Sequence, residues 1–126
     1  MDDRTKSEIV SIFNERILSP VLYMVEYDDI IDLICFCDRN IIIGEIYDTA
    51  AALQAATGKQ FEIVDIREFD EADRIDIIHN AELIYSEDRL IEKIFEQSML
   101  EDFEIMMRER EEAHTRYADN QSPYVQ

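Results

Sequence analysis

Residues 20–37, PVLYMVEYDDIIDLICFC, decide the fold of this 126-residue chain. Residues 21–27 and 30–37 are runs of aliphatic, β-branched and aromatic side chains, which are typical of buried strands. Because only Asp28 and Asp29 separate the two runs, we expect a tight turn and an antiparallel hairpin. Asp32 lies inside the second run, where a carboxylate costs free energy unless it has a partner, a proton or a metal ion. The surroundings of Asp32 therefore decide whether this hairpin belongs to a functional site.

The rest of the chain predicts helices and further strands around this hairpin. Apolar residues at helical spacing indicate the helices, and short apolar runs indicate the strands. We expect Thr5 or Ser7 to cap the first helix, Gly58 to end the second in a left-handed conformation, and Asp70 to cap the third. The predicted helices are residues 5–18, 43–56, 70–80 and 86–117, and the predicted strands are 21–27, 30–37, 59–66 and 81–85.

The helical periodicity also predicts which side chains are buried. In the second helix the expected buried stripe is Ile43, Ile46, Tyr47, Ala50, Ala51 and Leu53 or Gln54. In the last helix it is Ile91, Ile94, Phe95, Met99, Phe103 and Met106 or Met107. The fold class is α/β (α+β), a small mixed sheet of three to four strands with flanking helices in the order α-β-β-α-β-α-α. We expect one domain over residues 1–118 and a flexible tail over 119–126.

Composition excludes several classes of function. With 12 basic and 30 acidic residues, the net charge of −18 opposes binding to nucleic acid or to an anionic membrane and favours a basic protein partner. No apolar run approaches the ~20 residues of a membrane span, and the polar N-terminus has no secretory apolar region, so we expect a cytoplasmic protein. Cys35 and Cys37 predict buried thiols, because with only two histidines they are too few for a zinc site.

From Gly44 to Glu87 the sequence resembles the second half of the minimal nucleotidyltransferases (MNT-like proteins) of the DNA polymerase β superfamily. The matching pieces are a helix leading into Thr57-Gly58-Lys59, an acidic strand FEIVD at 61–65, and the segment LIY at 83–85. The resemblance covers most of the chain as a pattern. It implies a nucleotidyltransferase-like fold.

The resemblance also implies where a catalytic site would lie. These proteins hold nucleotide phosphates on a Gly-Ser after the first strand, and two Mg²⁺ on a D-x-D opening the second strand and a third acid on a later strand. In this sequence Asp32 takes the place of the second aspartate, Glu62 takes that of the third acid, and Ile30 stands in place of the first aspartate.

Two departures from that pattern argue against enzymatic activity. The chain has two glycines, Gly44 and Gly58, and neither follows the first strand, so the phosphate-binding Gly-Ser is absent. Isoleucine cannot coordinate Mg²⁺. The candidate metal ligands are therefore Asp32, Glu62 and Asp29 (or its neighbour Asp28), as the remnant of a site. The competing interpretation places Asp32 and Glu62 at a solvated end of the sheet, or in ion pairs with Arg4, Arg39 or Lys59.

Three hypotheses follow from the sequence. The first is a catalytically inactive nucleotidyltransferase-like protein without a cofactor, which acts by protein–protein contact as an antitoxin-like partner of a basic, helical HEPN-type protein, or with further copies of itself. The second is an active Mg²⁺-dependent nucleotidyltransferase with a rearranged acidic site. The third is an unrelated small α/β module, which requires a topology other than a mixed sheet with flanking helices.

Overall fold

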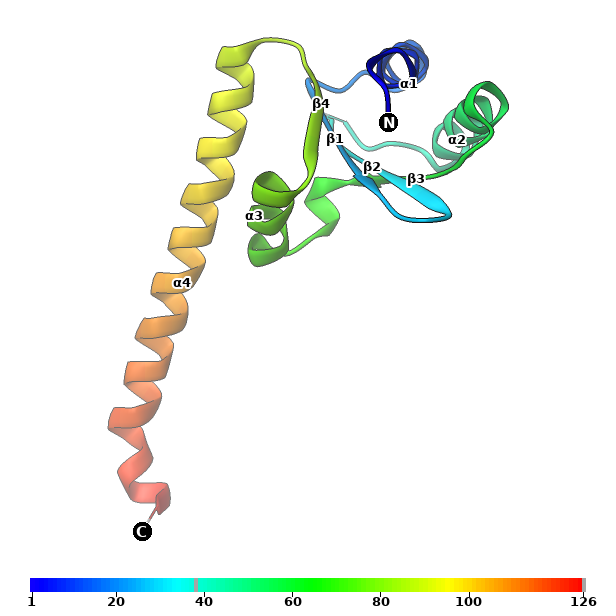
Figure 1. Cartoon of the computed structure of the whole chain (residues 1–126). Coiled ribbons are helices and arrows are strands. Elements are labelled where there is room, and N and C mark those ends of the chain that lie inside the picture. The colour runs from blue at the N-terminus through cyan, green and yellow to red at the C-terminus, as the bar shows by residue number, and fades with distance from the viewer. Residues whose placement is uncertain (38, 126) are drawn as a thin grey trace.

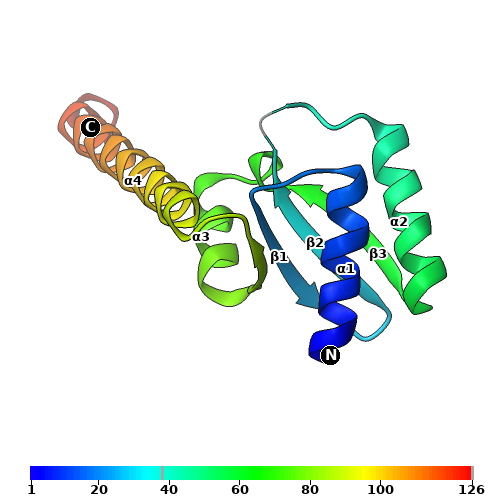
Figure 2. The same cartoon turned by 90° about the horizontal axis from the view of Figure 1, so that it is seen from above.

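A four-stranded mixed sheet lies between two layers of helices (Figures 1 and 2). The computed structural model describes residues 1–37 and 39–125, and the side chains within this range up to residue 118. The strands are β1 (Val21–Glu26), β2 (Ile30–Phe36), β3 (Gln60–Asp65) and β4 (Glu82–Ser86), and their order in the sheet is β3-β2-β1-β4. β2 runs antiparallel to β1 and parallel to β3, and β4 runs antiparallel to β1. The predicted mixed sheet is confirmed, and the hypothesis of another topology is wrong.

Each face of the sheet is covered by a different pair of helices. The helices are α1 (Asp3–Arg16), α2 (Ile43–Thr57), α3 (Glu71–Asn80) and α4 (Arg89–Val125), with a short 3₁₀ helix, η1 (Ile66–Glu68), after β3. α1 and α2 cover one face, whereas α3 and the first part of α4 cover the other (Figure 2). The rest of α4 extends away from the sheet (Figure 1). Within the described range, none of the helices combines the length and the apolarity needed to cross a bilayer.

The alternation of side chains along β1 and β2 divides the core in two. Leu22, Leu33 and Cys35 pack with Phe13 of α1 and Leu53 of α2. Their neighbours along the strands point to the opposite face and form the second cluster, which contains Val21, Tyr23, Ile34, Phe95 and Met99. Cys35 and Cys37 are buried free thiols, as predicted.

The predicted helix ends are partly correct. Gly58 adopts a φ of 75° after α2, and Asp70 caps α3, both as predicted. The cap of α1 is neither Thr5 nor Ser7: the Oδ1 of Asp2 accepts a hydrogen bond from the Thr5 N–H at 2.7 Å. An Asp at the N-cap satisfies one of the free N–H groups of the first turn, so the helix begins two residues earlier than expected.

The buried stripes predicted for α2 and α4 need correction. In α2, Ile46 and Leu53 face the core, but Ile43 and Tyr47 are 68% and 69% exposed. In α4, Ile94 is 61% exposed and Ile91 is also exposed, whereas Phe95 and Met99 are buried as predicted. Both helices are apolar on more than one side, so periodicity alone could not identify the side that packs on the sheet. α4 runs on to Val125 instead of ending near Tyr117. The predicted flexibility of residues 119–126 stays a prediction. The side chains of residues 119–125 and the whole of residue 126 lie outside the part that the structure describes.

The hydroxyl group of Ser19 links the α1–β1 connection to the end of β2 by hydrogen bonds. Removing this hydroxyl group should destabilise the fold. The fully buried Ser19 Oγ accepts a hydrogen bond from the Phe36 N–H at 3.1 Å and lies 2.9 Å from the Phe36 C=O, to which it can donate. Because Ser19→Ala leaves buried backbone groups unpaired, we expect a loss of about 1–3 kcal/mol in the free energy of unfolding, measured by urea denaturation. Ser11→Ala, at an exposed position of α1, should change it by less than about 0.5 kcal/mol. Equal effects of the two substitutions would contradict this role.

Candidate acidic site

The parallel pairing of β2 and β3 brings two carboxylates together. Asp32 lies directly opposite Glu62 in the strand register, and Ile30 lies opposite Gln60 two residues earlier. Directly paired residues point to the same face of a sheet, and so do residues two apart along a strand. Asp32, Glu62 and Ile30 therefore share one face, as the resemblance implied for the positions of the three acids.

Asp29 does not join this pair. The Tyr27 N–H donates a hydrogen bond to the Ile30 C=O at 2.9 Å, which closes the β1–β2 hairpin and leaves Asp28 and Asp29 exposed in its turn. Within the described residues, no group of three or more His, Cys, Asp or Glu side chains is arranged to hold a metal ion. The structure thus brings together two of the three predicted ligands.

Among the described residues, none of the three basic side chains that were expected to pair with Asp32 or Glu62 forms an ion pair with either of them. Arg39 binds Glu45 through a bidentate ion pair, with Nη1 at 2.8 Å from Oε1, instead of reaching Asp32 or Glu62. In the described part of the chain, neither Arg4 nor Lys59 forms an ion pair with Asp32 or Glu62. The ion pairs that the competing interpretation offered are therefore not formed in the described structure, whereas the exposure of Glu62 agrees with its other alternative, a solvated position.

The surroundings of Asp32 favour its protonated form. Its Oδ1 is buried and has no hydrogen-bond partner among the described residues. Burial is the main cause that raises the pKa of Asp32 above its usual value of 3.8, and the neighbouring Glu62 raises it further through its negative charge and as a hydrogen-bond acceptor. The ionised form of Asp32 is thus less favourable here than at an isolated, solvated carboxyl group.

Asp32 opens into a cavity of about 300 Å³ between the sheet and α3. Among the described residues, its polar lining is acidic or neutral, and no Lys or Arg is part of it. The lining residues are Val25, Tyr27, Asp32, Ile34, Phe69, Asp73, Asp76, Ile77, Asn80 and Ala81. A phosphate would therefore meet carboxylates without a cation to balance it, whereas a cationic group would find acceptors.

Sequence reasoning missed the part of this cavity that α3 supplies. Asp73, Asp76 and Asn80 follow one another at spacings of three and four, which places them on one side of a helix. Asn80 donates hydrogen bonds to the Asp76 carbonyl oxygen at 3.1 Å and to its Oδ1 at 2.7 Å. This spacing was the available signal, but it could not show that the polar side of α3 faces Asp32.

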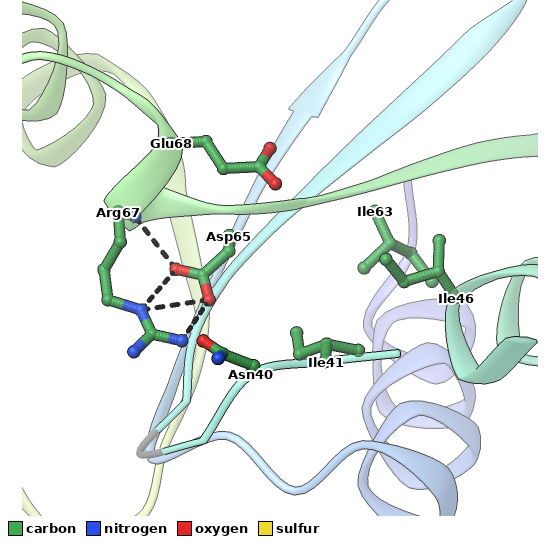
Figure 3. Close-up of a pocket in the computed structure, with 7 residues that line it drawn as sticks. All are labelled: Asn40, Ile41, Ile46, Ile63, Asp65, Arg67 and Glu68. Atoms are coloured by element: carbon green, nitrogen blue, oxygen red, sulfur yellow. Dashed lines mark hydrogen bonds and ion pairs between the residues drawn. The ribbon is translucent and has the colours of Figure 1, made fainter. Parts of the chain in front are cut away.

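A second cavity, of about 400 Å³, lies at the carboxyl ends of β2 and β3 (Figure 3). Arg67 points at Asp65 there and donates hydrogen bonds to it from Nε at 3.1 Å and from Nη2 at 2.7 Å. Arg67 also donates to the Arg39 C=O at 2.8 Å, and its guanidinium lies 5.9 Å from the centre of the Phe36 ring. These contacts occupy the Arg67 guanidinium, and its hydrogen bonds with Asp65 raise its pKa further. We interpret these contacts of Arg67 as structural, because they stabilise the end of the sheet.

The residues present do not fit the two-Mg²⁺ site that the resemblance implies. The position of the first aspartate is Ile30, and the hairpin passes from β1 to β2 through Tyr27, Asp28 and Asp29 without a glycine. Two neighbouring carboxylates, one of them with a raised pKa, supply too little negative charge and too few ligands for two divalent ions. No catalytic step through a metal can be derived from this arrangement.

No protein-family model matches the sequence, and no curated protein matches it either. The fold, however, matches solved structures of toxin–antitoxin complexes, in which the matching protein is MntA, a minimal nucleotidyltransferase antitoxin. The MntA–HepT complex matches with a TM-score of 0.73 and 12% identity, over 93% of this chain and 99% of that one. The complex of the tri-AMPylated Shewanella oneidensis HEPN toxin with its MNT antitoxin matches with a TM-score of 0.73 and 13% identity, over 94% and 99%. A toxin–antitoxin structure with AMP-PNP matches with a TM-score of 0.69 and 11% identity, over 90% and 98%.

Similarity at 11–13% identity establishes the fold. The nucleotidyltransferase-like fold that the sequence resemblance predicts is therefore confirmed. The match spans 93–94% of this chain and 99% of each of those two chains, so Ile30 and the β1–β2 turn lie in a chain that follows this fold over almost its whole length.

Replacing Asp32 by asparagine should stabilise the protein at neutral pH. The folded state binds a proton on Asp32 more tightly than the unfolded state, so stability falls as the pH rises from 3.8 through the raised pKa. Asp32→Asn removes this effect. Because the carboxylate is only partly buried, we expect a gain of about 0.5 kcal/mol at pH 7 that disappears near pH 3.5.

The measurement is urea denaturation at both pH values, with Asp29→Asn in the exposed turn as the matched control. That control should leave the free energy of unfolding within about 0.3 kcal/mol of the parent at pH 7. A difference between Asp32→Asn and the parent that does not vary with pH would contradict the assignment.

Proposed function

We propose that this chain is an antitoxin-like protein that has lost nucleotidyl transfer and acts by binding a helical HEPN-type partner with a basic surface. The observation that carries this proposal is the β1–β2 connection. The Tyr27–Ile30 hydrogen bond closes it at 2.9 Å, so the hairpin has neither the glycine-containing segment that holds phosphates nor a carboxylate at position 30. Binding without transfer is the function that remains for this face of the domain.

The charge distribution supports a basic partner. The cavity beside Asp32 presents Asp73 and Asp76 as well, and no Lys or Arg of the described part of the chain lines it. The chain as a whole carries a net charge of −18. Such a surface attracts and orients a positively charged protein, and this attraction weakens as the ionic strength rises.

The structural comparisons support the class of partner. In the complex from Shewanella oneidensis, an MNT antitoxin of the same fold is bound to a HEPN toxin. We extend this type of partner to the present chain. The extension combines the shared fold with the acidic cavity, because the fold alone permits either catalysis or binding.

The purified chain should neither transfer AMP from ATP nor respond to Mg²⁺. We expect no radiolabel from ATP on the partner or on the chain itself, and a change in melting temperature below about 1 °C with 5 mM MgCl₂. Ile30→Asp restores a carboxylate beside Asp32 and should introduce a Mg²⁺-dependent rise in melting temperature of at least about 2 °C. Transfer by the parent chain that Asp32→Asn abolishes would instead establish the rearranged active site.

Binding to a HEPN-type protein with a basic surface should depend on the acidic cavity. The double variant Asp73→Asn/Asp76→Asn removes two charges from the lining, and we expect its affinity to fall about 10-fold or more in isothermal titration at low salt. The matched control Glu109→Gln/Glu111→Gln removes two charges from the exposed side of α4 and should change the affinity less than about 3-fold. Equal losses in the two variants, or affinity that does not vary with salt, would count against this cavity as the contact.

A further inference from the structure

The polar side chains that line the cavity beside Asp32 mainly accept hydrogen bonds. Ionised Asp32, Asp73 and Asp76 carry acceptors and no donor. Asn80 uses its Nδ2 to donate to the carbonyl oxygen and to the Oδ1 of Asp76, at 3.1 Å and 2.7 Å, which leaves the Asn80 Oδ1 as a further acceptor. A ligand that complements this lining must therefore supply several donors.

The buried oxygen of Asp32 distinguishes this cavity from the rest of the acidic surface. The chain carries 30 acidic residues, and an exposed carboxylate is solvated by water wherever it lies. The Oδ1 of Asp32 is instead buried and has no hydrogen-bond partner among the described residues. A buried acceptor without a donor raises the free energy of the folded state. A donor that enters the cavity can remove this cost.

The basic side chain nearest to the cavity in the sequence does not supply this donor. Arg74 follows Asp73 directly, but it donates to the Ile66 C=O from Nε at 3.2 Å and to the Arg67 C=O from Nη2 at 3.0 Å. Among the described ion pairs, none involves a carboxylate of the cavity. The acceptors are therefore available to a cation that comes from outside the chain.

The rest of the lining is apolar or aromatic and sets the shape of the ligand. These residues are Val25, Tyr27, Ile34, Phe69, Ile77 and Ala81. The volume of about 300 Å³ is at the lower end of the range of small-molecule pockets, roughly 300–1,000 Å³, and suits a single side chain. The ligand that fits combines a positive charge, several donors and an apolar stem.

We propose that this cavity binds the guanidinium group of one arginine side chain of the basic partner. A guanidinium has five N–H donors and no acceptor, is weakly hydrated, and stacks on aromatic rings. Its planar fork can reach carboxylates on both sides of the cavity, because Asp32 belongs to β2 whereas Asp73 and Asp76 belong to α3. The ammonium group of lysine is more strongly hydrated, so it loses more on entering a largely apolar cavity. The inference rests on the proposed function for the source of the arginine.

Titration of the full chain with N-acetyl-argininamide, followed by NMR, tests the site without the partner. We expect shifts in the amide signals of residues 30–34 and 73–81 and a dissociation constant of roughly 1 mM. N-acetyl-citrullinamide has a similar shape without the charge and should bind at least about 10-fold more weakly. N-acetyl-lysinamide should bind at least about 3-fold more weakly. Equal affinity for the arginine and citrulline probes overturns the proposal.

Two variants separate the cavity from general attraction to an acidic chain. Asp32→Asn removes the buried charge, and Ala81→Leu fills part of the cavity without changing the charge, so each should weaken binding of N-acetyl-argininamide at least about 5-fold. The matched control Glu109→Gln removes one charge from the exposed side of α4 and should change the affinity less than about 2-fold. Equal effects of Asp32→Asn and Glu109→Gln, or full binding by Ala81→Leu, contradict the site.

Two further measurements identify the source of the cation. Spermidine presents alkylammonium groups without a protein, and we expect it to bind at least about 3-fold more weakly than N-acetyl-argininamide. Tighter binding of spermidine that Ala81→Leu weakens assigns the cavity to a free polyamine and overturns the choice of arginine. If N-acetyl-argininamide binds in the cavity but no HEPN-type protein binds the chain, the proposed function fails and the site stands. If the HEPN-type protein binds and N-acetyl-argininamide does not, the site fails and the proposed function stands.

Discussion

The hydrogen bond from the Tyr27 N–H to the Ile30 C=O, at 2.9 Å, closes the turn on which the rest of the structure depends. It aligns β1 with β2 so that Val25 lies opposite Asp32, and the parallel pairing of β2 with β3 then places Glu62 on the other side of Asp32. A turn this short excludes an inserted phosphate-binding segment. The β2–β3 pairing therefore assembles the acidic pair, and the short turn removes the element that would place a nucleotide beside it.

The position of Asp32 explains how a central strand tolerates a carboxylate. A fully enclosed charge would cost several kcal/mol, but Asp32 opens into the cavity beneath α3, and its neighbour Glu62 is exposed. The remaining cost is expressed as a raised pKa of Asp32, because burial and the nearby charge of Glu62 both disfavour its ionised form. Asp65, which lies on β3 like Glu62, behaves differently, because an ion pair with Arg67 compensates its negative charge directly.

The sequence identified the hairpin and the mixed sheet, because strand alternation and short connections leave few arrangements. The proximity of Asp32 to Glu62 followed instead from the resemblance to the minimal nucleotidyltransferases. It could not identify the buried side of α2. Both sides of that helix are apolar, and only packing against α1 and β3 selects Leu53 over Tyr47. It also could not place Asp73 and Asp76 beside Asp32, because the contact joins residues about forty positions apart and depends on how α3 sits on the sheet. Local patterns define elements, whereas sites between elements require the tertiary structure.

The acidic cavity makes the electrostatics of this domain depend on ionic strength. Around Asp32, Asp73 and Asp76 the negative potential attracts cations, and salt weakens such an attraction. The net charge of −18 over the whole chain acts in the same direction, and it opposes contact between two copies of the chain. Electrostatics therefore favours a positively charged binding partner over a second copy of the same chain.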